Sequence, residues 1–192
     1  IHRSVLDQFA KKLVANLTHV TIGPGIENPK MGPLVSQEQL DRVLAYIDIG
    51  KQEGARLMCG GNRLTRDALA RGYYVEPTVF VDVNNQMRIA REEIFGPVAV
   101  LIPFDTEDEA VRIANDTEFG LAAGVWTADI SRAHRLATKL QAGQVYINNY
   151  QGVNIEAPFG GYKQSGMGRE KGIEAIHDYT QLKTVIVPTV AR

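Results

Sequence analysis

The sequence predicts an α/β protein that is built on a parallel β-sheet with helices on its faces. Between residues 98 and 147, apolar runs alternate with helical periodicity in the order strand, helix, strand, helix, strand. Near-continuous apolar strands joined by helices are typical of a parallel sheet covered on both faces. Hydrophobic residues make up 44% of the 192 residues and charged residues 22%, as in an ordinary globular protein.

Four helices are predicted, each from a capping residue that precedes an apolar stripe at helical spacing. The capping residues, in chain order, are Ser4, Ser36, Thr106 and Asp129. The stripe of the first helix is expected to consist of Leu6, Phe9, Leu13 and Leu17. Glycine is favoured just beyond a helix, so Gly54 and Gly143 are expected to end the second and fourth helices.

Strands are predicted between these helices. They cover residues 57–59, 73–83, 98–104, 122–126 and 144–147. Residues 183–190, with the sequence KTVIVPTV, form one more apolar segment, and no later residue in the chain would cover it. An open strand of this kind needs a partner, so it is expected to pair with another subunit.

Composition excludes several classes of protein. The net charge is -1 and no basic stripe is present, which argues against nucleic-acid binding. No apolar run approaches the roughly 18 residues that span a bilayer, so no membrane association is expected. A single cysteine, Cys59, fits a reducing compartment and a cytoplasmic location, and the four histidines show no spacing for a metal site.

The glycine-rich segment of residues 160–172 allows two interpretations. One is a phosphate cradle, but GMGREKG is one residue too long for the dinucleotide fingerprint, and Gln follows Lys163 where a P-loop needs Ser or Thr. The other is a tight crossing of backbone segments, in which the glycines supply positive φ angles. The pattern favours the crossing.

Two acids, Glu92 and Glu93, stand immediately before the apolar run PVAVLIPF. A carboxylate removed from water is costly unless it has a partner. One hypothesis is a salt bridge to Arg88 or Arg91 together with a helix cap. The other is that one acid accepts hydrogen bonds from the two hydroxyls of a ribose. Sequence spacing leaves both open.

Four motifs together resemble the NAD(P)-dependent aldehyde dehydrogenase superfamily. They are EEIFGPV at 92–98, NDTEFGLAAGVWT at 115–127, LQAGQVYINN at 140–149 and PFGGYKQSGMGRE at 158–170. The resemblance covers essentially the whole chain, and the nearest branch acts on betaine aldehyde and aminoaldehydes. It implies a Rossmann-like catalytic domain followed by a C-terminal oligomerisation strand. The expected division is a partial catalytic domain at 1–167, then a C-terminal helix and strand at 168–192.

The resemblance assigns roles to individual residues. Glu93 would bind the nicotinamide ribose of NAD or NADP, and Phe95 would lie beside the nicotinamide. The segment from residue 149 to residue 159 resembles the loop at the aldehyde entrance. The residues expected to line the substrate tunnel are Tyr150, Val153, Glu156 and Phe159. A similar acid at Glu156 accompanies cationic substrates, although a role in anchoring the loop is an equal alternative.

The resemblance also implies what the chain lacks. In the family, a cysteine attacks the aldehyde, the thiohemiacetal passes a hydride to the nicotinamide, and a glutamate activates the water that hydrolyses the thioester. Both residues are expected upstream of Ile1, and Cys59 is not at the catalytic position. The chain is therefore expected to be inactive alone and to belong to a homodimeric or homotetrameric enzyme that takes a small aldehyde.

A different hypothesis is a non-catalytic assembly module or pseudo-enzyme. The DNA upstream of Ile1 would discriminate the two hypotheses. A reading frame that continues to a cysteine would favour the enzyme, whereas a start codon would favour the module.

Overall fold

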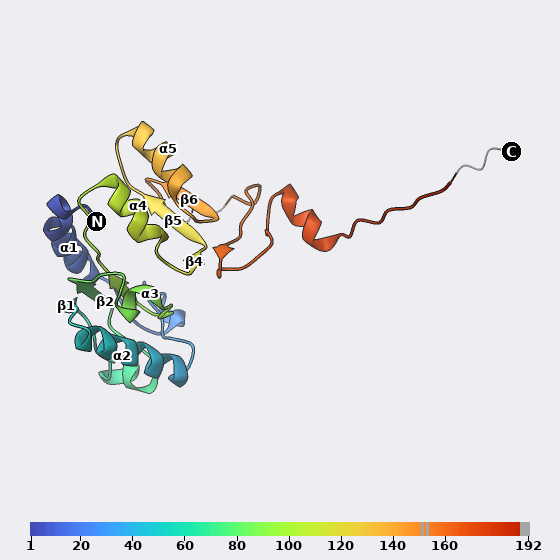
Figure 1. Ribbon diagram of the computed structural model, residues 1–192. Coiled ribbons are helices and arrows are strands. Elements are labelled where there is room, and N and C mark those ends of the chain that lie inside the picture. The colour runs from blue at the N-terminus through green and yellow to red at the C-terminus, as the bar shows by residue number, and fades with distance from the viewer. Residues whose placement is uncertain (151, 153, 189–192) are drawn as a thin grey trace. The chain divides into compact units, whose positions relative to one another are not determined.

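The computed structural model describes residues 1–150, 152 and 154–188, and the chain divides into two compact units, Ile1–Ile113 and Ala114–Arg192. The helices and strands of both units are drawn in Figure 1. They comprise α-helices, short 3₁₀ helices (η) and three small sheets. The predicted α/β class is confirmed, because each unit contains a pair of parallel strands together with helices.

The first unit is a three-stranded sheet with helices. Its elements are α1 (Arg3–Leu17), η1 (Gly25–Glu27), α2 (Gln37–Gln52), β1 (Arg56–Cys59), η2 (Asp67–Arg71), β2 (Thr78–Val81), α3 (Arg88–Arg91), β3 (Val98–Val100) and α4 (Glu107–Asn115). The strand order is β1-β2-β3, with β1 antiparallel and β3 parallel to β2. The sheet is therefore mixed, not purely parallel.

The strands predicted at 73–83 and 98–104 are shorter than expected. β2 begins directly after Pro77, which has no N–H to donate, and stops before Asp82, whose φ is +58°. β3 is interrupted after Val100, although Phe104 still pairs with His2 in a parallel bridge. Proline and left-handed backbone therefore set the ends of β2, where apolar composition alone would have continued the strand.

The core of the first unit consists of two clusters, and β2, the central strand, contributes its residues to them alternately. Phe80 is fully buried in a cluster with residues of α2, including Leu40 and Ile47. Its neighbours Val79 and Val81 belong to a second cluster with Ala10 of α1 and Leu101. Since successive side chains of a strand point to opposite faces, α1 and α2 cover opposite faces of the sheet. The prediction of helices on both faces is confirmed for this sheet.

Two details of α1 correct the sequence-based prediction. Ser4 does not cap the helix, because the ring of His2 accepts a hydrogen bond from the Ser4 N–H at 3.2 Å and the helix begins at Arg3. Phe9 remains 43% exposed, and Ala10 is buried in its place. The buried stripe follows Leu6, Ala10, Leu13 and Leu17, which recur every three or four residues.

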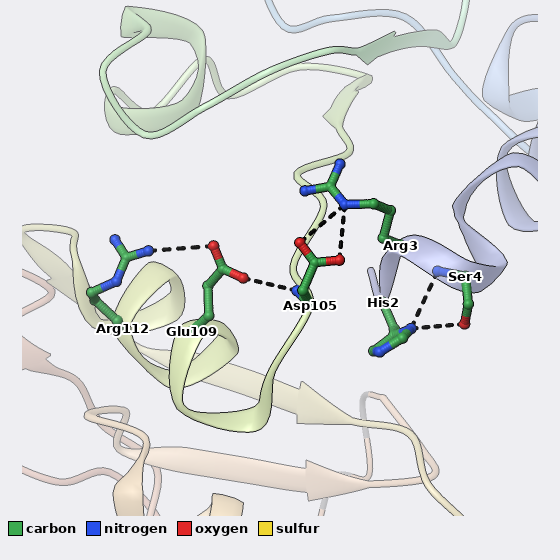
Figure 2. A network of polar contacts seen from close by, with 6 residues as sticks. All are labelled: His2, Arg3, Ser4, Asp105, Glu109 and Arg112. Atoms are coloured by element: carbon green, nitrogen blue, oxygen red, sulfur yellow. Dashed lines mark hydrogen bonds and ion pairs between the residues drawn. The ribbon is translucent and has the colours of Figure 1, made fainter.

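A charged network holds the starts of α1 and α4 (Figure 2). The Arg3 guanidinium nitrogen Nε lies 2.9 Å and 3.0 Å from the two carboxylate oxygens of Asp105. The Asp105 N–H donates to Glu109 Oε2 at 2.8 Å, and the Glu109 N–H donates to Thr106 Oγ1 at 3.2 Å. The predicted Thr106 cap is confirmed, and Arg112 adds a contact of 3.5 Å to Glu109.

The second unit contains a strand–helix–strand crossover. Its elements are β4 (Phe119–Gly120), β5 (Ala122–Val125), α5 (Ile130–Lys139), β6 (Gln144–Ile147), β7 (Tyr162–Lys163) and η3 (Ile173–Tyr179). β5 and β6 are parallel, with α5 lying against both (Figure 1). The predicted Asp129 cap is confirmed by its bond of 3.0 Å from the Arg132 N–H. The antiparallel pair β4–β7 was not predicted.

The prediction that Gly143 ends the fourth helix is wrong. α5 ends at Lys139, and a Cβ built at Gly143 would collide with the carbonyl oxygen of Gly160. At Gly160 a Cβ would lie 2.5 Å from the carbonyl oxygen of Gly168. These glycines let backbone segments cross at a distance that no side chain permits. The crossing interpretation of the glycine-rich segment is confirmed, and three of its glycines, at 166, 168 and 172, have positive φ.

The C-terminal part follows η3 without further helix or strand up to residue 188 (Figure 1). Its apolar side chains are exposed, with Val185 at 73%, Ile186 at 84% and Val187 at 78%. Residues 189 and 190 of the predicted strand lie outside the described residues. Pairing of this segment with another subunit stays a prediction. No helix in the described part of the chain is long and apolar enough to cross a membrane.

Candidate functional site

Residues 92–95, called here the EEIF loop, connect α3 to the segment before β3. Ile94 is 8% exposed and belongs to the core cluster that contains Leu40 and Val43 of α2. Gly96 follows so close to α2 that an added Cβ would lie 2.5 Å from Val43 Cγ2. The burial of Ile94 and the lack of a side chain at Gly96 therefore allow the EEIF loop to pack closely against α2.

The carboxylate of Glu92 has well-defined partners. Arg88 Nε lies 2.8 Å from Oε1 and Nη2 lies 3.0 Å from Oε2, while the Tyr46 hydroxyl donates to Oε2 at 2.5 Å. These bonds, those from Arg88 first, favour the charged carboxylate and lower the pKa of Glu92 to about 2. The same bond to Glu92 raises the pKa of Tyr46. The salt-bridge hypothesis is confirmed for Glu92, with Arg88 as its partner.

The carboxylate of Glu93 has different surroundings. It is exposed, and no hydrogen bond or ion pair from the described residues reaches it. Its backbone is nevertheless fixed, because the carbonyl oxygen accepts a bond of 2.7 Å from Arg42 Nη2. Glu93 therefore presents an unpartnered carboxylate on a backbone that is held in place.

Phe95 has strained backbone geometry. Its φ is +56°, in the left-handed region that bulky side chains rarely enter, and its side chain is 71% exposed. The carbonyl oxygens of Ile94 and Phe95 both accept from Gln39 Nε2, at 3.0 Å and 2.9 Å. Strain of this kind persists where neighbours determine the conformation, and it concentrates at functional sites. The EEIF loop thus exposes an aromatic side chain two residues after Glu93.

In the second unit, aromatic rings gather where the parallel strands β5 and β6 end. The Tyr150 ring is 55% exposed and lies 5.6 Å from that of Tyr146, between centroids. A Cβ at Gly124 would lie 2.5 Å from the Trp126 ring and 3.4 Å from that of Tyr150. Ligands of parallel sheets bind beyond the carboxyl ends of their strands. Tyr150 is thus at a suitable end of the sheet for a tunnel residue.

Two more of the predicted tunnel residues lie in the following loop. Phe159 is partly buried, pairs with Glu170 through two backbone bonds of 2.7 Å and 2.8 Å, and has Lys171 Nζ 5.1 Å from its ring centroid. Glu156 is exposed, and no hydrogen bond within the described part of the chain reaches its carboxylate. Backbone bonds such as Gly172 N–H to the Ile155 carbonyl, at 2.9 Å, hold this loop. Val153 lies outside the described residues.

Cys59 is poorly suited to nucleophilic chemistry. Its Sγ lies 3.8 Å from the carbonyl oxygen of Pro77, and burial raises the pKa of the thiol. A raised pKa reduces the fraction of reactive thiolate. Nowhere among the described residues do three or more His, Cys, Asp or Glu side chains lie together in a way that could hold a metal ion.

The sequence analysis did not predict the residues that hold the EEIF loop. Gln39, Arg42 and Tyr46 lie at positions i, i+3 and i+7 of α2, which is the spacing of one helix face. That spacing can be seen in the sequence. The loop that these residues contact could not be predicted, because it lies about 50 residues further along the chain.

The fold and the EEIF loop define an α/β protein in which a loop with an unpartnered carboxylate precedes a parallel strand. The chain belongs to the aldehyde dehydrogenase family, whose family model matches residues 1–185. Among its relatives, betaine aldehyde dehydrogenase of Brucella anthropi is 52% identical over 188 residues, which are 97% of this chain and 39% of that protein. The chain thus spans about two fifths of the length of the curated relatives it matches.

Solved structures of the family have the same fold. Betaine aldehyde dehydrogenase of Staphylococcus aureus in complex with NAD+ superposes with a TM-score of 0.90 at 42% identity, over 93% of this chain and 35% of that chain. HpcC of Thermus thermophilus gives 0.92 at 46% identity, over 100% and 39% of the two chains. An aldehyde dehydrogenase of Bacillus cereus gives 0.91 at 50% identity, over 96% and 37%.

Proposed function

We propose that the complete protein oxidises an aldehyde to a carboxylic acid with NAD(P)+, and that Glu93 and Phe95 hold the nicotinamide end of the cofactor. One observation carries this proposal: an unpartnered carboxylate and, two residues later, an exposed aromatic side chain lie on one loop with strained backbone. Family membership supports it, as does the NAD+ complex of the S. aureus relative.

The chemistry of these residues fits the cofactor. A carboxylate accepts hydrogen bonds from both hydroxyls of a ribose, and Glu93 has no other partner among the described residues. An aromatic ring packs against a flat heterocycle, and the Phe95 ring is 71% exposed. Bound NAD(P)+ would supply the acceptor for a hydride. The residues of this chain would bind the cofactor and orient it.

The remaining catalytic groups belong to residues outside this chain. The proposed nucleophilic cysteine and general-base glutamate precede Ile1, so the 192 residues alone would turn over no aldehyde. We propose residues 1–167 as part of the catalytic domain and 168–192 as the segment that joins subunits. Tyr150, Glu156 and Phe159 would line the passage for the aldehyde.

The test is Glu93→Gln in the complete enzyme. The amide keeps the size of the side chain but loses the charge-assisted hydrogen bonds to ribose, which are worth about 1.5–3 kcal/mol. NAD+ should therefore bind about tenfold or more weakly, while the melting temperature should stay nearly the same. Titration by fluorescence or calorimetry measures the NAD+ affinity, and thermal unfolding measures the melting temperature.

Glu118→Gln is a matched control, since it makes the same change at an exposed carboxylate in the other unit. It should leave cofactor binding unaltered. Unchanged NAD+ affinity and turnover in Glu93→Gln would refute the cofactor role of Glu93.

A further inference from the structure

Three side chains of α2 converge on the EEIF loop. Gln39 donates to the Ile94 and Phe95 carbonyl oxygens, and Arg42 donates to that of Glu93 at 2.7 Å. Tyr46, one turn further along the helix, donates to the Glu92 carboxylate at 2.5 Å. Every residue of the EEIF loop thus accepts a hydrogen bond from one face of α2.

Tyr46 is itself held on both sides. The Arg42 guanidinium carbon lies 5.5 Å and that of Arg88 5.7 Å from its ring centroid, within the range of cation–π attraction. Arg88 also donates two hydrogen bonds to the Glu92 carboxylate. The backbone N–H of Arg88 donates to the two carboxylate oxygens of Glu53, at the end of α2, at 2.9 Å and 3.0 Å. Tyr46, Arg88 and Glu92 form one closed set of contacts, called here the latch.

The latch contributes little to the stability of the fold. The Arg88 and Glu92 side chains are 53% and 40% exposed, and ion pairs at such sites are weak because water screens them. Burial of Ile94 already attaches the segment to the core. The contacts instead fix the residue immediately before Glu93, whose own carboxylate is left free.

We propose that Tyr46 and Arg88 are positioning residues, which grip Glu92 so that Glu93 and Phe95 are preorganised for the nicotinamide end of the cofactor. This inference rests on the proposed function of the EEIF loop. It adds two residues that do not themselves touch the cofactor. Preorganisation of a binding loop increases affinity by removing the entropy cost of ordering it on binding.

The experiment uses the complete enzyme with Tyr46→Phe and Arg88→Gln. Tyr46→Phe keeps the ring and both cation–π contacts but removes the bond to Glu92. Each variant should bind NAD+ about threefold to tenfold more weakly. ADP, which lacks the nicotinamide riboside, should bind each variant as it binds the unmodified enzyme. A general loss of structure would weaken the binding of both ligands.

Two further variants isolate the mechanism. Arg56→Gln makes the same change as Arg88→Gln at another exposed ion pair of the unit, with Asp82 at 2.7 Å, and should leave NAD+ binding unchanged. In the Glu93→Gln background, Tyr46→Phe should have a smaller effect than in the unmodified enzyme. Such non-additivity is expected when two residues act through one contact.

The outcomes separate this inference from the proposed function. NAD+ binding that Glu93→Gln weakens but Tyr46→Phe and Arg88→Gln leave unchanged would overturn the positioning role and leave the proposed function standing. Equal weakening of NAD+ and ADP by the latch variants would also overturn it, as a structural effect. An unmodified enzyme that binds neither NAD+ nor NADP+ would overturn both.

Discussion

Glu92 and Glu93 are adjacent in sequence, yet their carboxylates have opposite surroundings. Glu92 accepts three hydrogen bonds from Arg88 and Tyr46, whereas Glu93 accepts none on its carboxylate from the described residues. The salt-bridge interpretation is therefore confirmed for Glu92, and the ribose interpretation stays a prediction for Glu93. The ion pair belongs to Glu92, and Glu93 remains available for a ligand.

The pKa of Glu92 gives a prediction for acidic solution. Its value is lowered from 4.5 to about 2, so the folded state binds the proton less well than the unfolded state. The stability that this contributes is present above about pH 4.5 and is lost as the pH falls through about 2. Because both side chains of the ion pair are exposed, the stability difference between the unmodified protein and Glu92→Gln should be small, and it should shrink steadily over that range.

Urea unfolding at a series of pH values measures this difference. Comparison with Glu92→Gln removes the contributions of other acids with lowered pKa values, such as Asp105 and Asp129. A stability difference that stays constant between pH 5 and pH 3 would show that the latch does not hold Glu92 in its charged form.

At the scale of elements, the crossing of backbone segments around Gly143 fixes the second unit. Gly143→Ala should destabilise the protein by about 1–3 kcal/mol, because the new methyl group meets the carbonyl oxygen of Gly160 and backbone cannot easily move aside. Chemical denaturation measures the loss. Gly25→Ala is the control, since nothing lies within 4 Å of a Cβ there, and it should change stability by less than about 0.5 kcal/mol.

The C-terminal segment gives a second prediction at this scale. Its exposed apolar side chains, including Ile186 at 84% and Val187 at 78%, would be covered if the segment paired with a strand of another subunit. Deleting the residues after Leu182 in the complete protein should therefore produce monomers or aggregates. Light scattering measures the mass of the particles. An unchanged oligomer would contradict the pairing of this segment with another subunit.

For the molecule as a whole, we predict a preference for cationic aldehydes from two residues of the second unit. Tyr150 supplies an exposed aromatic face, and Glu156 an exposed carboxylate in the loop that follows. A cation gains about 0.5–2 kcal/mol on an aromatic ring.

The measurement compares kcat/KM for a trimethylammonium aldehyde and its neutral carbon isostere in the complete enzyme. The cationic substrate should be preferred, and Glu156→Gln should reduce the preference while Glu118→Gln leaves it alone. A ratio of the two kcat/KM values near one in the unmodified enzyme would indicate an enzyme that oxidises aldehydes broadly. Glu156 would then have only the role of anchoring its loop.

The sequence by itself determined the family, the α/β class and most of the elements. Helix caps such as Ser36 and Asp129, and the strand 144–147, were predictable because capping and strand formation depend on neighbours within a few residues. At Gly143 the prediction was wrong because a distant contact decided. Gly143 was assigned to a helix end because its crossing partner, Gly160, lies 17 positions further along the chain.

The ion pair of Glu92 with Arg88 is local, because the two residues are spaced i, i+4. Tertiary structure decided the other contacts of the EEIF loop. The packing of α2 against this loop brings Tyr46 to the Glu92 carboxylate and Arg42 to the backbone of Glu93. Contacts between residues about 50 positions apart depend on how helices pack, and packing follows from the burial of the whole core.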